Sequence, residues 1–263
     1  MQFVEPQVFH IAHTTLMEEG VQDYLDALDI PDWVTDAPSD VEKLIEIMGR
    51  GCYRSFQPEM NKNVTKIRVG NEPYIKNILD VANGSVIEHA VDSYIFLNVS
   101  RVFTHELVRH RIGTAFSQES LRYVRLDSLK CWFPKVFQDH PSAGILKAAM
   151  ENAYNTMEEW QRDLSKILDI DNIKDFNTKK KLTSAMRRFA PIGLATMIGF
   201  SCNPRSLRFV IQQRTSESAE EEIRIVFGKV AREQARCYPN LYQDMHEEIV
   251  DGIEKYTFKN HKV

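Results

Sequence analysis

Apolar side chains recur along the chain with two different periods, and these periods predict its strands and helices. Residues 7–13 alternate loosely between apolar and polar side chains, which is typical of a strand. After Ser39, a typical helix N-cap, apolar side chains recur every three or four residues, and this spacing predicts a helix that ends near Gly49 or Gly51. The same reasoning predicts further helices at 72–83, 101–111, 145–168, 179–188, 205–213, 219–237 and 241–253, and strands at 90–99, 121–125 and 193–202.

Helices outnumber strands in this prediction, and the strands are short and apolar. The order of the elements does not alternate regularly between strand and helix, so a sheet built from repeated βαβ units is not expected. No internal repeat and no Gly/Ser-rich linker divides the chain. We therefore expect an α/β or α+β fold with a mixed sheet flanked by helices.

The composition is that of an ordinary globular protein, with 43% hydrophobic and 27% charged residues. Its 33 Lys and Arg residues against 37 Asp and Glu residues give a formal net charge of −4. A surface that binds nucleic acid everywhere is therefore not expected, and an anion site must come from a local concentration of arginine. The N-terminus lacks the basic and apolar regions of a secretory signal, and the longest uncharged stretch, 189–204, contains Pro191. We expect a cytoplasmic protein that does not bind a membrane.

Several common catalytic motifs are missing. The cysteines are far apart and form no C-x-x-C pair, which excludes a zinc ribbon and a dithiol redox motif. His105 and His110 are five residues apart, whereas a zinc protease helix needs two histidines on one face. Neither a P-loop nor a complete G-x-G-x-x-G occurs, so a Rossmann-type nucleotide site is not expected. We expect structural thiols and no metal site.

The densest group of charged residues begins with Arg109, His110 and Arg111 and runs to Tyr123. Because Gly113 follows, the simplest interpretation is that these cations stabilise the end of a helix. On the predicted helix, however, Arg101, His105 and Arg109 would stack in one column, which is unfavourable unless carboxylates or a bound anion neutralise the charge. The spacing thus favours an anion site beside this helix.

A second indication of an anion site comes from Ser120 and Arg122. In the predicted extended segment they lie on the same side, about 7 Å apart, as a hydroxyl and a guanidinium that grip one phosphate would. Arg187 and Arg188, at the end of another predicted helix, are typical of solvated helix-end charges unless such a site lies nearby.

The C-terminal third places an arginine on an apolar stripe. Arg214 continues the helical spacing of Leu207, Val210 and Ile211, and therefore points toward the core side of its helix. A guanidinium in that position needs a partner. Two partners stay open at this point: Glu217 or Glu221 on the helix surface, or a bound ligand.

Taken together, these segments resemble the flavin-dependent thymidylate synthases. The resemblance rests on the S-V-I-E-H stretch at 85–89, the R-H-R at 109–111, the S-x-R-Y at 120–123, the R-S-L at 205–207, and Arg214, and it spans about 44–227. It implies one domain of this family over 1–263 with its core at about 40–230, a non-Rossmann FAD site, and a homotetramer whose active sites are shared between subunits.

The resemblance also implies an activity: reductive methylation of dUMP to dTMP, with 5,10-methylenetetrahydrofolate as the one-carbon donor, NADPH as the reductant and no enzyme nucleophile. Arg214 matches the position that faces the pyrimidine, where it would stabilise negative charge during activation. The residues that match FAD-contacting positions are Ser85, Arg109, His110, Arg111, Gln118, Asn203, Arg205 and Phe209. Those that match dUMP-contacting positions are Glu106, Arg109, Gln118, Glu119, Ser120, Arg122, Arg187 and Arg214.

The sequence departs from the family pattern in several places. Eight residues rather than seven separate Arg111 from Ser120. The other departures are Asn83, Phe209 and Ser218 where the family commonly has His or Asn, and Glu106 where it has Gln. These departures keep two alternatives open: the same fold acting on another pyrimidine nucleotide or hydroxymethylating it, and a non-enzymatic nucleotide- or RNA-binding protein, which the net charge places last.

Overall fold

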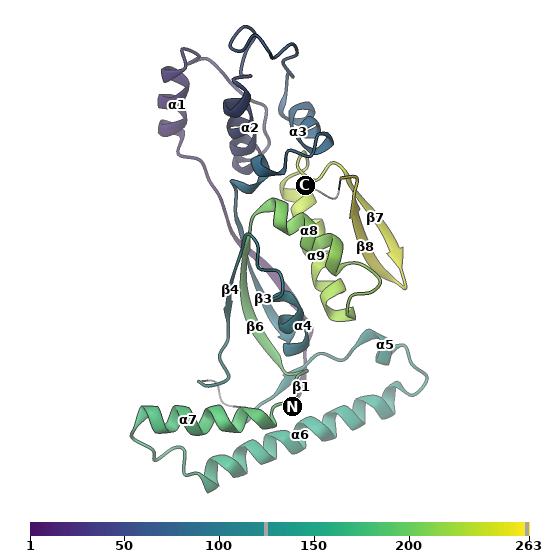
Figure 1. The fold of residues 1–263 in the computed structure, drawn as a ribbon. Coiled ribbons are helices and arrows are strands. Elements are labelled where there is room, and N and C mark those ends of the chain that lie inside the picture. Colours follow the sequence, from purple (N-terminus) through teal and green to yellow (C-terminus); the bar gives the residue numbers. More distant parts are fainter. Residues whose placement is uncertain (124–125, 261–262) are drawn as a thin grey trace.

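The computed structural model describes residues 1–123, 126–260 and 263. A central sheet lies between two helical ends, which gives the molecule an elongated shape (Figure 1). The helices are α1 (Glu18–Ala27), α2 (Asp40–Tyr53), α3 (Asn71–Asp80), η1 (Gly84–Glu88), α4 (Arg101–Leu107), α5 (Lys135–Gln138), α6 (Ala143–Ile167), α7 (Phe176–Met186), η2 (Arg187–Phe189), α8 (Pro204–Arg214) and α9 (Glu221–Cys237). The strands are β1 (Gln2–Phe3), β2 (Gln7–His13), β3 (Asp92–Ser100), β4 (Thr114–Gln118), β5 (Lys130–Cys131), β6 (Ala195–Cys202), β7 (Met245–Val250) and β8 (Ile253–Phe258).

The central sheet has the strand order β2-β3-β6-β4, and each of its pairings is antiparallel. The short pair β1 and β5 is parallel, and β7 with β8 forms a separate hairpin. The expected α/β architecture, with sheets flanked by helices, is thus confirmed, but the expected mixed sheet is wrong, because all pairings of the central sheet are antiparallel. Within the described part of the chain, the helices are all too short or too polar to cross a membrane.

The main hydrophobic core lies between one face of this sheet and the helices α4, α8 and α9. Phe96 of β3 is at its centre, with its ring centroid 5.5 Å from that of Phe103 in α4 and 5.8 Å from that of Phe227 in α9. The core continues into the C-terminal hairpin through Tyr256 and Phe258. This packing holds α4 and α8, the two helices that carry the arginine clusters, against the same sheet.

The predicted helix after Ser39 runs further than expected. It ends at Tyr53 rather than at a glycine, and Arg54 provides the left-handed residue that stops it, with φ 48°. A Cβ on Gly49 would lie 2.4 Å from the hydroxyl oxygen of Tyr74. The glycine is therefore needed for a close approach between helices, so its use as a stop signal was wrong.

The predicted final helix at 241–253 is wrong, because this segment contributes to the β7–β8 hairpin. The turn consists of Asp251 and Gly252, both with positive φ (55° and 73°). An Asp-Gly pair in which both residues have positive φ is a preferred two-residue hairpin turn, so the sequence contained the signal.

The helix predicted at 101–111 ends at Leu107, so the expected column of Arg101, His105 and Arg109 does not form. Gly113, with φ 66°, turns the chain into β4, a strand that the sequence pattern did not reveal. The extended segment predicted at 121–125 is also wrong where it is described: residues 121–123 form a turn, and 124–125 lie outside the described residues. The other predicted helices and strands are confirmed, with ends shifted by a few residues.

Candidate active site

Helix α4 is fixed at its N-terminus by a buried hydrogen-bond network. Its N-cap Ser100 accepts from the backbone N–H of Phe103 over 3.0 Å. The backbone N–H of Ser100 in turn donates to Glu222 of α9 over 2.8 Å. Burial raises the pKa of Glu222 to about 7. The position of α4 against α9 therefore depends on a carboxyl group that can change its charge near neutral pH.

At the other end of α4, Arg214 binds two partners at once. Its Nη1 donates to the carboxylate of Glu106 over 2.7 Å, and its Nη2 to the backbone carbonyl of the same residue over 3.0 Å. Its Nε donates to Nε2 of His110 over 2.7 Å. This cluster, hereafter the Arg214 cluster, consists of Arg214, Glu106 and His110, and its guanidinium is held in one orientation.

The partners of Arg214 differ from those considered from the sequence. Glu217 pairs with Lys255 over 2.9 Å instead. Glu221 accepts from the backbone N–H of Val136 over 3.0 Å. The negative charge of Glu106, which departs from the family pattern, is thus compensated by Arg214 within the same chain.

His110 is neutral in this cluster. Burial and the neighbouring guanidinium of Arg214 lower its pKa to about 4. A neutral imidazole that accepts at Nε2 carries its proton on Nδ1, so His110 still has one N–H to donate. Its ring packs edge-on against Phe209, with 6.1 Å between the ring centroids.

A cavity of about 710 Å³ opens beside the Arg214 cluster, between α8 and the segment after α4. Its lining combines cations with apolar side chains, so it suits a ligand with an anionic group and an aromatic ring. We call it the flank cavity, and it is lined by Ala82, Glu88, Arg109, His110, Arg111, Ile112, Arg205, Ser206, Phe209, Val210 and Val263.

Some residues predicted at this site form hydrogen bonds or ion pairs within the chain. Asn203 caps α8 by accepting from the N–H of Ser206 over 2.9 Å, and Arg205 pairs with Glu88 over 2.6 Å. Ser85 donates to Asn83 over 3.3 Å rather than lining the flank cavity. Gln118 donates to Thr104 of α4 over 2.8 Å. Among these residues, Arg205 lines the flank cavity, whereas Asn203, Ser85 and Gln118 are not among its lining residues.

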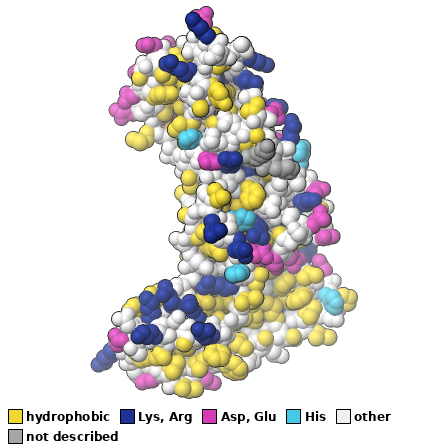
Figure 2. Space-filling view, in the orientation of Figure 1, with side chains coloured by type: hydrophobic (Ala, Val, Ile, Leu, Met, Phe, Trp, Pro, Cys, Tyr) yellow, Lys and Arg dark blue, Asp and Glu magenta, His cyan; other side chains and the backbone are white. Residues whose placement is uncertain are grey.

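A second cavity, of about 620 Å³, carries a concentration of positive charge. We call it the basic cavity. Among the described residues, none of its four cations forms a salt bridge with a carboxylate. Basic side chains also gather in the lower part of the surface in Figure 2, where α7 lies. The cavity is lined by Arg101, Leu121, Lys181, Ser184, Ala185, Arg187, Arg188, Ala190, Pro191 and Ile192.

Ser120 and Arg122 are adjacent, as predicted, although they belong to a turn. The hydroxyl of Ser120 accepts from the backbone N–H of Arg122 over 3.4 Å. Arg101 donates to the backbone carbonyl of Glu119 over 3.1 Å, while its buried Nε has no hydrogen-bond partner in the described part of the chain. Helical spacing had indicated an anion site near Arg101, although the column on which that expectation rested does not form. No signal in the sequence indicated Lys181 as a lining residue of this cavity.

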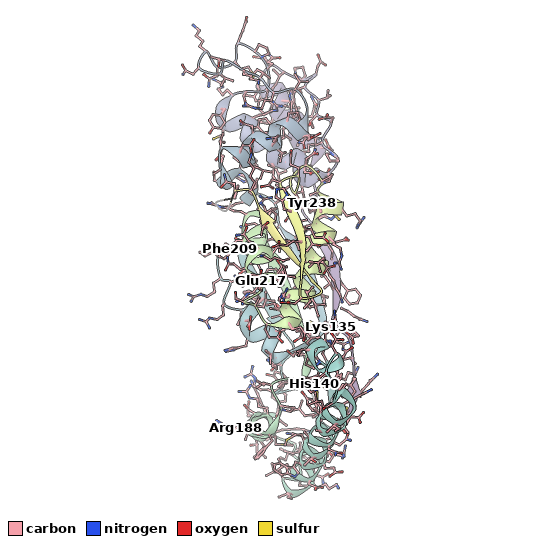
Figure 3. All side chains as sticks on the ribbon, turned by 90° about the vertical axis from the view of Figure 1, so that its right-hand side faces the viewer. Lys135, His140, Arg188, Phe209, Glu217 and Tyr238 are labelled. Carbon is pink, nitrogen blue, oxygen red and sulfur yellow. The ribbon has the colours of Figure 1, made fainter. Side chains whose placement is uncertain are left out.

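Of the predicted substrate residues, Arg109 lines the flank cavity and Arg187 lines the basic cavity. Strand β4 separates them, and its five residues at about 3.3 Å each span about 17 Å. Phe209 and Arg188 project from the same side of the molecule but far apart along its length (Figure 3). Glu106, Arg109 and Arg214 therefore lie at one end of β4, and Glu119, Ser120, Arg122 and Arg187 at the other.

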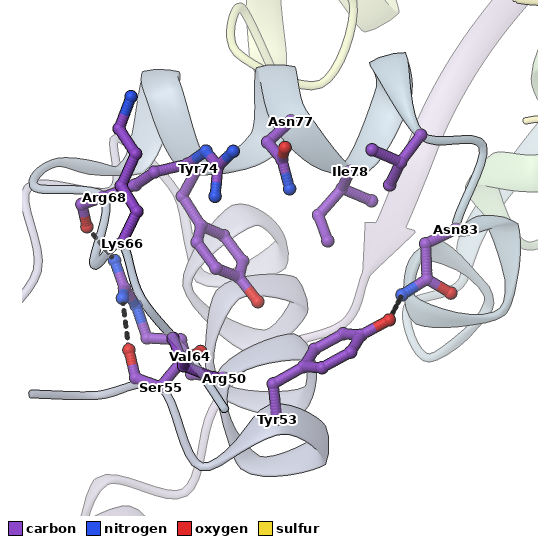
Figure 4. A pocket seen from close by; sticks show the side chains of 11 residues that line it. Arg50, Tyr53, Ser55, Val64, Lys66, Arg68, Tyr74, Asn77, Ile78 and Asn83 are labelled. Carbon is purple, nitrogen blue, oxygen red and sulfur yellow. Dashed lines mark hydrogen bonds between the residues drawn. The ribbon is translucent and has the colours of Figure 1, made fainter. Parts of the chain in front are cut away.

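A third hollow, of about 350 Å³, lies between α2, α3 and the loop that joins them (Figure 4). Arg50 is held there by hydrogen bonds to the backbone carbonyls of Ser55 (2.8 Å) and Arg68 (2.9 Å). At its rim, Asn83 donates to the hydroxyl of Tyr53 over 3.4 Å. No motif in the sequence indicated this hollow.

Ser218, another departure from the family pattern, is exposed, and its hydroxyl lies 3.1 Å from that of Ser216.

Comparison with known proteins shows which family the chain belongs to. Residues 34–240 match the family described as "Thymidylate synthase complementing protein". Flavin-dependent thymidylate synthases from Mycobacterium avium (strain 104) and Mycobacterium tuberculosis are each 34% identical, over 237 and 238 residues, and each comparison covers 89% of this chain and 91% of the relative.

Solved structures show the same fold at lower identity. The UMP/dUMP methylase PolB from Streptomyces cacaoi, bound with 5-Br dUMP, has a TM-score of 0.64 at 13% identity, covering 92% of this chain and 96% of the other. Thymidylate synthase X from Helicobacter pylori, with FAD and dUMP, has a TM-score of 0.54 at 18% identity, covering 90% and 99%. The chain therefore belongs to the thymidylate synthase complementing protein family, which includes the flavin-dependent thymidylate synthases.

Proposed function

We propose that this protein is an FAD-dependent thymidylate synthase. It would methylate dUMP to dTMP, with 5,10-methylenetetrahydrofolate as one-carbon donor and NADPH as reductant. The observation that carries the proposal is the Arg214 cluster, in which one guanidinium is fixed by Glu106 and by a neutral His110 beside a cavity that suits an aromatic ligand. The family membership and the named relatives support the same activity.

The residues of the flank cavity fit FAD. Arg109, Arg111 and Arg205 offer guanidinium groups to its phosphates, and Phe209 and Ile112 offer apolar surface to a ring system. Gly84 allows a close approach of Arg205, whose Nε would lie 2.5 Å from a Cβ at that position. When bound and reduced, FAD supplies hydride to the reaction.

The basic cavity fits the phosphate of dUMP. Arg101, Arg187 and Arg188 supply positive charge and form no salt bridge with a carboxylate of the described chain, and Ser120 and Arg122 flank the lining residue Leu121. A bound phosphate would provide the missing counter-charge. The hydroxyl of Ser120 would add a neutral donor, and the turn at 121–123 would position both groups.

The Arg214 cluster would bind the pyrimidine. Its guanidinium donates toward carbonyl oxygens of the ring and stabilises the negative charge that develops there when C5 becomes nucleophilic. The carboxylate of Glu106 accepts from a ring N–H, so an acid is useful at this position. Burial raises the pKa of the Cys131 thiol to about 12 and that of the Cys202 thiol further, so neither is a ready nucleophile at neutral pH.

The separation of the two cavities supports a site that is shared between subunits. A nucleotide whose phosphate lies in the basic cavity of one copy would reach the Arg214 cluster of another copy. The open face of the sheet offers a surface for such an assembly, because Phe9 (45% exposed) and Leu97 (37% exposed) lie on the side away from the core. We propose the homotetramer that the resemblance implies.

The test is an anaerobic reaction of the purified protein with FAD, NADPH, 5,10-methylenetetrahydrofolate and dUMP, followed by mass spectrometry of the nucleotide. We expect a product in which one hydrogen is replaced by a methyl group. Parallel reactions with UMP reveal a different nucleotide preference, and a hydroxymethylated product reveals a different chemistry. Unchanged nucleotide, together with salt-dependent RNA binding and no flavin uptake, would contradict the proposal.

A further inference from the structure

A cluster of metal-ligating side chains lies outside both cavities, where β2 packs against α9. Among the residues that the structure describes, His10, Glu233 and Cys237 bring one ligand atom each within 4.8 Å of one another. Nδ1 of His10 is 3.9 Å from a carboxylate oxygen of Glu233, and Sγ of Cys237 is 3.5 Å from the same oxygen. A nitrogen, an oxygen and a sulfur at such spacing can converge on one ion after small side-chain movements.

Local structure explains why these residues meet. Glu233 and Cys237 are four residues apart on α9, so both point toward β2 from one helix face. On β2, His10 pairs with Tyr94, and the pairing register then shifts between His10 and Ala12, so that His13 pairs with Asp92. This bulge places His10 and His13 on the same face of the strand, and their ring centroids are 6.1 Å apart. Without the bulge, they would lie on opposite faces.

The environment of His10 is the one that a metal-bound histidine requires. Its Nε2 lies 2.8 Å from the carboxylate of Asp92, which leaves Nδ1 directed at Glu233. Asp92 is completely buried and also accepts from the hydroxyl of Tyr238 over 2.6 Å. Its second oxygen, Oδ2, has no hydrogen-bond partner in the described part of the chain. When an imidazole binds a metal through one ring nitrogen, a carboxylate hydrogen-bonded to the other ring nitrogen fixes the orientation of the ring and increases its basicity.

We propose that His10, Glu233 and Cys237 bind a divalent transition metal ion, with Zn²⁺ as the best match to a nitrogen, oxygen and thiolate donor set. Binding displaces the proton of the Cys237 thiol, so the thiolate becomes a ligand and one proton is released to solvent. The fourth position is left to a water molecule, and the ring of His13, whose centroid is 6.1 Å from that of His10, lies on the same face of the strand. The ion would connect the edge strand of the sheet to α9.

Arg236 competes with the metal in this site. It donates to both oxygens of Glu233, over 2.6 Å and 3.1 Å, while its side chain is 70% exposed. The pair is therefore easily opened, and the free carboxylate then faces His10 and Cys237. A substitution at Arg236 should therefore increase metal affinity without changing a ligand residue or the core.

The test uses purified full-length protein, stripped with a chelator and titrated with Co²⁺, whose bond to a thiolate gives a charge-transfer absorption in the near ultraviolet. We expect one equivalent to bind with this band, and Zn²⁺ to displace it. Cys237→Ser should abolish the band, whereas Cys52→Ser, which changes an exposed thiol in α2, should retain it. His10→Gln should weaken binding at least tenfold.

Arg236→Gln keeps the proposal falsifiable even where a ligand variant folds poorly. Its circular dichroism should match that of the wild type, and its Co²⁺ affinity should be higher. A wild-type protein without the thiolate band, a band that persists in Cys237→Ser, or an affinity in Arg236→Gln that is unchanged or lower would each overturn the site. The measurement is independent of the proposed synthase activity, because it requires neither flavin nor nucleotide.

Discussion

The two ends of α4 each gather arginines, but they neutralise them differently. At the C-terminal end, Arg214 has a donor directed at Glu106 and another at His110, so its charge and its hydrogen bonds are matched within the chain. At the N-terminal end, the cations of the basic cavity, among them Arg101 and Arg187, form no salt bridge with a described carboxylate. One end is preorganised in geometry, while the other retains net positive charge.

The difference indicates two kinds of binding. A guanidinium whose orientation is fixed can discriminate the edge of a ring and stabilise charge that appears during a reaction, since little reorganisation is needed. A group of unmatched cations attracts a dianion over a longer range and is more sensitive to salt. The fixed guanidinium of Arg214 should therefore determine kcat. The cations of the basic cavity should determine the KM of the anionic substrate.

The largest effect is expected at Arg214. Arg214→Ala should lower kcat for dTMP formation by about 10²–10³, as the loss of one preorganised donor does in other active sites. Arg214→Lys should lower kcat nearly as much. An ammonium group keeps the charge but cannot donate to Glu106 and His110 in the geometry of the planar guanidinium. The measurement is single-turnover product formation with saturating dUMP. A kcat of Arg214→Ala within threefold of the wild type would remove Arg214 from the catalytic role.

A second test concerns the helix that carries both ends. Glu222 of α9, which accepts a hydrogen bond from Ser100 at the start of α4, has an ordinary pKa of 4.5 that burial raises to about 7. The folded state thus binds a proton that the unfolded state releases, so the free energy of unfolding should fall as pH rises from about 4.5 to about 7. At about 1.4 kcal/mol per pKa unit, the loss is about 3 kcal/mol.

Glu222→Gln should remove most of this decrease, as measured by urea unfolding between pH 4.5 and 8. The matched control is Glu159→Gln on the exposed side of α6, which should keep the wild-type pH dependence. Equal pH dependence in wild type and Glu222→Gln would show that α4 is not held by a titrating carboxyl group. The two arginine regions would then respond to pH separately.

At the basic cavity, Arg187→Ala should raise the KM for dUMP about tenfold to 100-fold, since hydrogen bonds to charged groups are worth about 1.5–3 kcal/mol. The kcat should change little, in contrast to Arg214→Ala. The wild-type KM should also rise with salt more steeply than that of the variant. Lys174→Ala, an exposed cation outside the cavity, is the control. A fall in kcat without a change in KM would reverse the assignment of the two ends.

The sequence predicted the local features of this fold better than those that depend on distant neighbours. The strand at Gln7–His13 and the cap at Ser39 were correct, because periodicity and capping act within a few residues. Strand β4 was missed because it is short and is defined by its pairing with β6. Gly49 was misinterpreted, since its role depends on Tyr74, which lies on another helix.

The same distinction applies to the candidate sites. Arg214 was singled out from its place on an apolar stripe, but its partner Glu106 is 108 residues away and could not be found from helical spacing. Arg101 was linked to an anion site only through a helical column that does not form. The metal site was not expected either, because His10 and Cys237 lie near opposite ends of the chain and their approach depends on the packing of β2 against α9. Sequence spacing thus identifies individual side chains, whereas clusters follow from topology.

The smallest effect is expected from a substitution of Phe209. It tests whether the cavities at the two ends of α4 also differ in their apolar side chains. Phe209 lines the flank cavity and packs against His110, but the basic cavity has no aromatic side chain among its described lining residues. Aromatic contacts contribute about 0.5–1.5 kcal/mol, so Phe209→Ala should weaken FAD binding about twofold to tenfold, with the KM for dUMP little changed. Titration of flavin fluorescence measures the affinity, and Phe137→Ala, which changes a half-exposed ring beside Phe133, is the control. An FAD affinity equal to that of the wild type would place the flavin away from α8. The flank cavity would then hold no flavin, and the Arg214 cluster would have to act on the pyrimidine without a flavin beside it.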